Sequence, residues 1–348
     1  MNKIESALRR TTDTRALAFG VGTLPRAAEL FVELFPGRRA LVVADLNTWR
    51  VAGEEVHRIL GEAGIGQDAP CVFADPGLYA EWGYVERLDA LLAGTDAVGA
   101  EAMDDFAFSL VQDGLPEALC DPTGVHAGDV GKVGRLAEGL LLSGFAMQAA
   151  QSSRPASGAE HQFSHLWDME HLRFGGASVS HGFKVGIGTL ASTAFLEMLL
   201  EAPVERLDVA GCVAAWKSWE ETERDIRAVF AGDPELVARG LKETYGKYVD
   251  RQGLYEQLTR LRQAWPELRE RIRRQIIPFG EVHRRLRLVG APCEPEQIGV
   301  SRARFREAFA RIPYMRSRYS VIDTVFRCGW MEEWLDRLFG PGCIWEIR

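Results

Sequence analysis

The sequence has few cysteines, and none of them forms a recognisable metal-binding or disulfide motif. The six cysteines are scattered through 348 residues without a CxxC pair: Cys71, Cys120, Cys212, Cys293, Cys328 and Cys343. This spacing indicates neither a structural zinc ribbon nor a disulfide framework. The first residues, MNKIESALRR, lack the apolar segment of a secretion signal, and no stretch is expected to span a membrane. These absences predict a protein of the reducing cytoplasm.

An excess of positive charge is also lacking, because the formal net charge is −8. Nucleic acid and anionic membranes are therefore not expected as partners of the whole surface. The short run Tyr314–Tyr319, in which arginines alternate with aromatic residues, is interpreted as the packing of a C-terminal helix rather than as an RNA-binding segment. The hydrophobic fraction of 47% and the charged fraction of 26% are those of an ordinary globular protein. A chain of this length has room for two domains.

The N-terminal part alternates between apolar strand-like runs and helical patterns. The segments Ala16–Gly20, Arg39–Ala44 and Pro70–Ala74 are predicted strands, and Asp96–Val98 is a fourth candidate. Helical patterns separate them, at Arg26–Leu34, Trp49–Ala63 and Tyr84–Leu92. Such alternation predicts a parallel α/β sheet. We therefore expect residues 1–98 to form a Rossmann-like nucleotide-binding domain with a reduced sheet of three to four strands.

Asp45 follows the second predicted strand, where ligands gather in parallel sheets. Its carboxylate is suited to accept hydrogen bonds from a ribose hydroxyl, with Asn47 and Thr48 as neighbours. Asp45 and Asn47 also suit the cap of the following helix, and the two roles are compatible. The earlier sequence Gly-Val-Gly-Thr at residues 20–23 lacks the third glycine of the usual dinucleotide fingerprint.

Helical patterns dominate from residue 99 onward, and no strand is predicted there. Residues 99–348 are therefore expected to form an all-α domain. The longest predicted helices are Val130–Ala150, Thr189–Leu200, Val213–Ala231, Pro234–Tyr248 and Leu254–Gln275.

Four of the seven histidines lie between Ser152 and Thr189: His161, His165, His171 and His181. His161 and His165 are four residues apart and share a face if the segment is helical. His181 begins a separate glycine-rich segment. Neutral imidazole is a common ligand of zinc, iron and nickel, so two imidazoles from neighbouring elements and a carboxylate would form a metal site with open positions. Surface histidines held by hydrogen bonds remain the alternative.

These residues carry a resemblance to a known family. The segments Ala44–Gly53, Ser152–His161, Ile298–Phe305 and Arg316–Asp323, together with GAEHQFSH and HGFKVGIGT, resemble the sn-glycerol-1-phosphate dehydrogenases. That family belongs with the iron-containing alcohol dehydrogenases, glycerol dehydrogenase and dehydroquinate synthase. The similarity extends from about residue 15 to about residue 329.

The resemblance implies a divalent metal ion (zinc, nickel or iron), NAD or NADP as cofactor, and a small phosphorylated ketose or polyol as substrate. It assigns His161 and His181 as metal ligands, and Asp45, Asn47 and Thr48 to the cofactor. His165 and Lys184 are weaker candidates for the substrate, Lys184 for its phosphate, with a solvated helix residue as the alternative. A homodimer is a further expectation.

The sequence departs from the family pattern after Val98. The Gly-Ser-Gly phosphate loop, a cofactor loop, a Met-Asp-Gly motif and the aspartate metal ligand are all absent, and Val98 is followed directly by Gly99-Ala100-Glu101. Glu160, Asp168 and Glu170 are local candidates to replace the aspartate, although a glutamate adjacent to His161 on a helix should point elsewhere.

Three functions follow from these observations. The first is NAD(P)-dependent reduction of dihydroxyacetone phosphate to sn-glycerol 1-phosphate. The second is a non-catalytic or truncated member that serves in binding or oligomerisation. The third is a lyase of the dehydroquinate synthase type.

Overall fold

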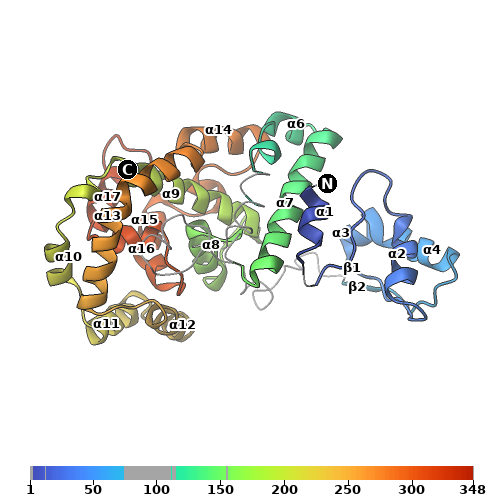
Figure 1. Cartoon of the computed structure of the whole chain (residues 1–348), viewed down its shortest axis with the longest axis horizontal. Helices are drawn as coiled ribbons and strands as arrows, with labels where there is room; N and C mark the ends of the chain where they lie inside the picture. Colours follow the sequence, from blue (N-terminus) through green and yellow to red (C-terminus); the bar gives the residue numbers. More distant parts are fainter. Residues whose placement is uncertain (1–2, 12, 74–110, 112–114, 154–155, 348) are drawn as a thin grey trace. The chain divides into compact units, whose positions relative to one another are not determined.

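The computed structural model describes residues 3–11, 13–73, 111, 115–153 and 156–347. The chain divides into two compact units, Met1–Arg87 and Leu88–Arg348. Both are drawn in Figure 1 with their helices and strands labelled. The predicted boundary at residue 98, the helix Tyr84–Leu92 and the strand candidate Asp96–Val98 lie outside the described residues.

The N-terminal unit contains a small parallel sheet, as predicted. Strand β1 (Val43–Asp45) pairs in parallel with β2 (Cys71–Phe73), and an isolated parallel bridge joins Ala40 to Gln67. The helical elements of this unit are α1 (Lys3–Leu8), α2 (Arg26–Leu34), α3 (Leu46–Thr48), the π-helical turn Trp49–Gly53 and α4 (Glu54–Glu62). Its apolar core is correspondingly small and is centred on Ala28, Ala40, Ile59 and Leu60.

One detail of the N-terminal prediction is wrong, because residues 16–20 form no strand. Two strands pair within the described part of this unit, and the candidate strand Asp96–Val98 lies outside it, so the sheet of three to four strands stays a prediction. A short apolar run becomes a strand only where a neighbour supplies ladder hydrogen bonds, and Ala16–Gly20 pairs with no described strand. The coarse division into a parallel-sheet unit and a mostly helical unit agrees with the sequence, whereas the Rossmann-like character stays a prediction.

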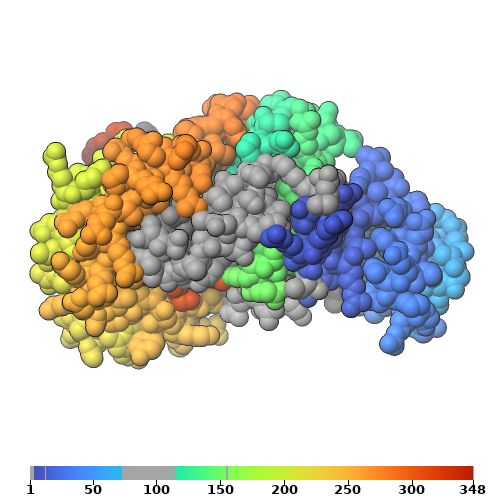
Figure 2. All heavy atoms as spheres, viewed as in Figure 1, coloured from blue at the N-terminus to red at the C-terminus, as the bar shows by residue number. Residues whose placement is uncertain are grey.

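The C-terminal unit is built mainly of helices. They are α6 (Pro122–His126), α7 (Val130–Ala150), α8 (Ala159–Met169), α9 (His181–Glu201), α10 (Val209–Ala215), α11 (Trp219–Val229), α12 (Pro234–Tyr245), α13 (Arg251–Gln275), α14 (Phe279–Val289), α15 (Arg302–Arg311), α16 (Val321–Arg327) and α17 (Met331–Phe339), with 3₁₀ turns at Val204–Arg206, Pro295–Ile298 and Ile312–Tyr314. The long α13 lies at the surface, and its orange atoms are open to view in Figure 2.

The predicted helix Val213–Ala231 is wrong as a single element, because it is divided between α10 and α11. Ser218 interrupts it by capping α11: the Ser218 side chain accepts the N–H of Glu221, and the Glu221 side chain accepts the N–H of Ser218. This capping box satisfies backbone donors that a continuous helix would have bonded internally.

The expectation of no strand in this unit is also wrong in one place. Residues Arg173–Phe174 (β3) and Ala177–Ser178 (β4) form a minimal antiparallel hairpin. Gly175 and Gly176 make its two-residue turn with φ of +60° and +83°. Positive φ at both central positions is the pattern of a type I′ turn, which glycine adopts without steric cost.

Helix α9 lies at the centre of the helical core. Phe195 on α9 packs its ring 4.9 Å from that of Phe309 on α15, which lies 4.8 Å from the ring of Phe163 on α8. By length and composition α9 could cross a membrane, contrary to the sequence expectation, but 61% of its most apolar window is buried inside this unit. The apolar surface of α9 is therefore used in the packing of the helical unit.

The run Tyr314–Tyr319 is largely buried, as the packing interpretation predicts, but the expectation of a helix is wrong, because the run joins the 3₁₀ turn Ile312–Tyr314 to α16. Tyr314, Arg316 and Tyr319 are each less than a tenth exposed. Arg318 donates a hydrogen bond from Nη2 to Ser153 Oγ at 3.0 Å.

Candidate functional site

Helices α8 and α9 bring the histidine motifs together. His161 and His165 lie on α8, and His181 is the first residue of α9. Ser180 caps α9, because its Oγ accepts the N–H of Phe183 at 3.3 Å. The two helices are neighbours in Figure 1, and Gly188 of α9 permits their close approach at Glu160. Positions 20 residues apart in the sequence thus become neighbours in space.

Three imidazole rings form a compact cluster. The ring centroid of His161 lies 5.2 Å from that of His181 and 5.9 Å from that of His165, and the rings of His165 and His181 are 6.4 Å apart. His171 is exposed, has a φ of +51° and belongs to none of these pairs. The structure therefore brings together His161, His165 and His181 out of the four histidines of the stretch.

Glu160 orients His161. Its Oε1 lies 2.9 Å from Nδ1 of His161 and accepts the backbone N–H of Gly158 at 2.6 Å. Although burial raises the pKa of Glu160, the hydrogen bonds from His161 and Gly158 hold it below its usual value. The expectation that Glu160 points away from His161 is wrong, because the side chain turns back to satisfy a backbone donor at the start of α8.

Three polar side chains follow one another next to His181. Nδ1 of His181 lies 2.9 Å from Oγ of Ser164 and 3.7 Å from Oδ2 of Asp168. Ser164 Oγ lies 3.3 Å from Asp168 Oδ2, and Nζ of Lys184 bonds to Asp168 Oδ1. Burial raises the pKa of Asp168, but the proximity of His181 and the ion pair with Lys184 lower it by more, so the net pKa is depressed.

Lys184 is buried, with a side chain only 6% exposed. The alternative of a solvated helix residue is therefore wrong, because the ammonium group is bonded to Asp168. Its predicted role toward a substrate phosphate stays a prediction.

His165 lies behind the other two rings and is 1% exposed. Burial, followed by the charges of Arg316, His161 and Arg239, holds the pKa of His165 well below its usual value. A buried and neutral ring beside the other two is consistent with the predicted place of His165 outside the ligand pair.

The histidine pair fits two ligands of a borderline divalent metal ion. Nδ1 of His161 faces the Glu160 carboxylate and Nδ1 of His181 faces the Ser164 hydroxyl, and within the described residues no hydrogen bond engages either Nε2 atom. Ligand histidines commonly direct Nδ1–H to an acceptor in this way. A complete ligand set is not present in the described part of the chain, where no group of three His, Cys, Asp or Glu side chains could hold a metal ion.

None of the three local carboxylates takes the place of the missing aspartate ligand. Glu160 and Asp168 lie on the Nδ1 sides of His161 and His181. Glu170 is held by Arg304, at 2.7 Å, and by Arg311. The spacing of Ser164 and Asp168, four residues apart on the face of His161 and His165, was a signal in the sequence for this polar group.

In the N-terminal unit, Asp45 lies at the C-terminal end of β1, as predicted. Its Oδ1 accepts the N–H groups of Asn47 at 2.8 Å and of Thr48 at 2.7 Å, and the Thr48 hydroxyl at 3.0 Å. The bonds from Thr48 hold the pKa of Asp45 below its usual value. All of these bonds are made to one oxygen, so the capping role leaves Oδ2 available for a further donor.

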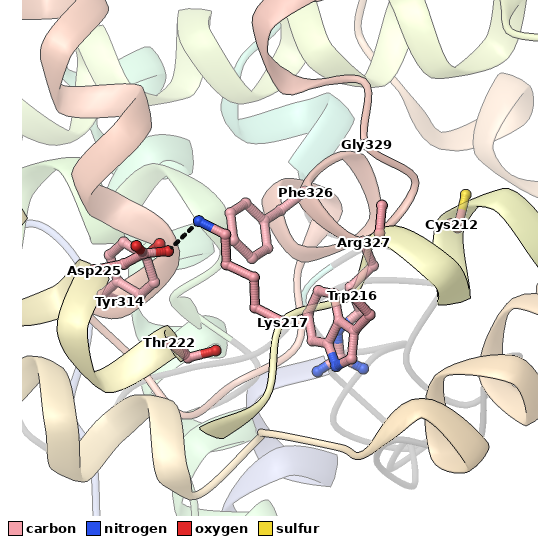
Figure 3. Close-up of a pocket in the computed structure, with 10 residues that line it drawn as sticks. Cys212, Trp216, Lys217, Thr222, Asp225, Tyr314, Phe326, Arg327 and Gly329 are labelled. Atoms are coloured by element: carbon pink, nitrogen blue, oxygen red, sulfur yellow. Dashed lines mark hydrogen bonds and ion pairs between the residues drawn. The ribbon is translucent and has the colours of Figure 1, made fainter. Parts of the chain in front are cut away.

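The helical unit also contains a pocket of about 190 Å³, shown in Figure 3. Trp216, Tyr314 and Phe326 supply much of its wall, and Lys217 Nζ lies 2.5 Å from Asp225 Oδ2 at its edge. None of the residues predicted as site residues lines this pocket.

Comparison with known proteins finds similarity to enzymes named glycerol-1-phosphate dehydrogenase. The chain is 42% identical over 94 residues to a glycerol-1-phosphate dehydrogenase (NAD(P)+) of Halalkalibacterium halodurans, which covers 27% of this chain and 22% of that protein. It is 25% identical over 263 residues to the enzyme of the same name from Bacillus licheniformis, covering 76% and 49% of the two chains. It is 36% identical over 93 residues to that of Pyrococcus furiosus, covering 27% and 26%.

The chain spans about half the length, or less, of the curated relatives described here. No family model and no solved structure matches it. The predicted resemblance to the sn-glycerol-1-phosphate dehydrogenases is confirmed by the similarities that do exist.

Proposed function

We propose that this chain is a metal- and NAD(P)-dependent sn-glycerol-1-phosphate dehydrogenase of low turnover, which reduces dihydroxyacetone phosphate. The observation that carries the proposal is the adjacency of His161 and His181 on α8 and α9, with ring centroids 5.2 Å apart. Both residues belong to the sequence motifs that resemble this family. The names of the curated relatives, which include NAD(P)+, support the same activity.

His161 and His181 would hold a zinc, nickel or iron ion through their Nε2 atoms. When bound, the metal supplies Lewis acidity toward the substrate carbonyl. His165, buried and neutral, packs against both rings and stays the weaker candidate to contact the substrate. The Lys184 ammonium, already bonded to Asp168, stabilises the side chains that surround His181.

Asp45, with Asn47 and Thr48 beside it, would bind the adenosine ribose of the cofactor. The Oδ2 atom left over from the capping interactions is the acceptor for the ribose hydroxyls. A carboxylate at this position disfavours a 2′-phosphate, so NAD is favoured over NADP.

Low turnover follows from the block missing after Val98. The family's phosphate loop would supply backbone N–H groups to the pyrophosphate, and each such charge-assisted bond is worth roughly 1.5–3 kcal/mol. Loss of two or three of them weakens cofactor binding by a factor on the order of a hundred or more. The family's aspartate ligand is absent as well, which lowers metal affinity.

NADH oxidation by the purified chain tests this proposal. We expect a slow rate that requires dihydroxyacetone phosphate, stops with a chelator, and is lost in His161→Ala and His181→Ala. A rate no greater than that of the buffer, with and without added Zn²⁺, Ni²⁺ or Fe²⁺, contradicts the proposal. Micromolar NADH affinity with rapid metal-dependent turnover would contradict the expectation of low activity.

A non-catalytic relative is the second candidate, favoured by the lack of a third metal ligand among the described residues. Such a protein would bind Co²⁺, seen by its visible absorption, but would not change NADH fluorescence at millimolar concentrations. Under either proposal we place the protein in the cytoplasm, with a small phosphorylated ketose or polyol as ligand and a homodimer as the assembly.

A further inference from the structure

A continuous series of polar contacts leads from Lys184 to the ring of His181. Lys184 Nζ bonds to Oδ1 of Asp168, and Oδ2 of the same carboxylate lies 3.3 Å from Ser164 Oγ. Ser164 Oγ in turn lies 2.9 Å from His181 Nδ1. Ser164 is fully buried and Lys184 nearly so, whereas the side chain of His181 is 46% exposed. The ring is thus held from its buried side and exposed on the other.

The direction of these hydrogen bonds follows from the number of protons. Ser164 has one hydroxyl proton and two neighbours that could receive it, Asp168 Oδ2 and His181 Nδ1. A carboxylate paired with an ammonium group is an acceptor only, and hydrogen bonds to a charged acceptor are the stronger ones. Ser164 therefore donates to Asp168. Its oxygen is then left to accept a hydrogen bond, and His181 Nδ1 must be the donor.

We propose that Asp168, acting through Ser164, fixes His181 in the tautomer that carries its proton on Nδ1 and leaves the Nε2 lone pair open. Lys184 holds the carboxylate in place for this purpose. Asp168 and Ser164 are positioning residues, because they act on a ligand through its far nitrogen. That the open Nε2 binds a metal rests on the proposed function, whereas the tautomer itself does not.

His161 is held in the same tautomer by a simpler arrangement. Glu160 Oε1 lies 2.9 Å from Nδ1 of His161 without an intervening hydroxyl. Glu160 acts directly on His161, whereas Asp168 acts on His181 through Ser164. In both rings Nε2 is left unprotonated. Two rings in the same tautomer, with centroids 5.2 Å apart, each keep an Nε2 lone pair, and the proposed function would direct both to one ion.

Nitrogen-15 NMR of histidine-labelled protein at alkaline pH tests the proposal directly, because protonated and unprotonated ring nitrogens have distinct shifts. The His181 signals are identified by their loss in His181→Gln. In the parent protein we expect the proton on Nδ1. In Asp168→Asn, the new side-chain amide can donate a hydrogen bond to Ser164 Oγ. The Ser164 hydroxyl then donates to His181 Nδ1, so the proton of the His181 ring should move to Nε2. Zn²⁺ affinity measured by calorimetry should fall by about 10- to 100-fold.

Glu170→Gln is the matched control, because it makes the same acid-to-amide change on the residue that caps the end of α8. Glu170 is bonded to Arg304 and Arg311 rather than to histidine. We expect it to leave the His181 tautomer and the Zn²⁺ affinity unchanged. Circular dichroism checks that each variant is folded. Should Asp168→Asn fail to fold, Ser164→Ala is used instead, and loss of the bridging hydroxyl should leave a mixture of tautomers.

The outcomes test the tautomer of His181 and the proposed metal-dependent function separately. A proton on Nε2 of His181 in the parent protein overturns the inference, and so does a proton that stays on Nδ1 in the folded Asp168→Asn variant. An Nδ1 proton that moves in Asp168→Asn supports the inference even if the parent protein binds no Zn²⁺. In that case it is the proposed metal-dependent function that fails.

Discussion

Gly188 of α9 lies against the backbone carbonyl of Glu160, the residue that precedes His161. A Cβ atom at position 188 would be 2.3 Å from that oxygen, a distance that real side chains do not adopt. The separation of the two histidine-bearing helices is therefore set by a glycine.

Gly188→Ala should force α8 and α9 apart. We expect a loss of roughly 1–3 kcal/mol or more in the free energy of unfolding, as in other overpacked cores, and weaker Zn²⁺ binding because His161 moves away from His181. Urea unfolding measures the change in stability, and calorimetry measures the change in Zn²⁺ affinity.

The control is Gly186→Ala on the same helix, where the nearest atom to a new Cβ is Leu286 Cδ2 at an ordinary 3.8 Å. This variant should be as stable as the parent or up to about 1 kcal/mol more so. Equal behaviour of the two variants would contradict the argument.

Asp45→Ala should lower both stability and cofactor affinity. Loss of the cap removes the acceptor of the Asn47 and Thr48 N–H groups, and loss of Oδ2 weakens NADH binding, which fluorescence titration measures. Asp233→Ala separates the two effects, because Asp233 caps α12 through the N–H of Leu236 in the helical unit. That variant should lose similar stability and keep its NADH affinity. If Asp45→Ala binds both cofactors as well as the parent protein, Asp45 has no role toward ribose.

Stability should decline between pH 10 and pH 12 because of two buried tyrosines. Burial raises the pKa of Tyr314 and of Tyr319 to about 12, above the value of about 10 in an unfolded chain. The stabilisation is fully present below pH 10 and is lost as the pH rises through about 12. It amounts to roughly 3 kcal/mol for each group at most.

Urea unfolding at several pH values measures this decline. Tyr319→Phe should make it shallower, whereas Tyr255→Phe should not, because Tyr255 is 49% exposed. An unchanged decline in Tyr319→Phe would show that the ionisation of Tyr319 does not contribute.

Thiol reagents should distinguish the exposed cysteines from the buried ones. Cys71 and Cys120 are exposed and should react rapidly in the folded protein, whereas the buried Cys293 and Cys328 should react only on unfolding. Burial also raises the pKa of the Cys328 thiol, so little thiolate is available. Mass spectrometry after timed alkylation measures the order. Rapid modification of Cys328 in the folded state would contradict the packing of α16.

The elements that sequence patterns predicted best are those whose stability is local. The bounds of α7 match the predicted Val130–Ala150, because Asp129 caps the helix and its apolar residues recur at helical spacing. The apolar run Arg39–Ala44 also predicted a strand near Asp45, and β1 forms at Val43–Asp45 because β2 supplies a partner. Ala16–Gly20 was not, because a strand needs a partner and composition does not show whether one is present.

In the histidine site, too, local sequence patterns were informative and contacts between separate helices were not. The motifs indicated His161 and His181, and the four-residue spacing placed His165 on the same face. The orientation of Glu160 depends on the unsatisfied backbone N–H of Gly158, which becomes apparent only when the start of α8 is known. The link from Asp168 through Ser164 to His181 depends on how two helices pack, and no periodicity within one segment contains that information.

The tight turn at Gly175–Gly176 has a consequence for how this protein folds. It joins α8 to α9 through a hairpin of two residues per strand, so the chain reverses direction within a short segment. Closing so small a loop loses little chain entropy, and contacts between near neighbours in sequence form faster than distant ones. The helices that carry His161 and His181 should therefore pack together early in folding. Helices α15 and α16, which begin more than a hundred residues after the end of α9, should pack against them later.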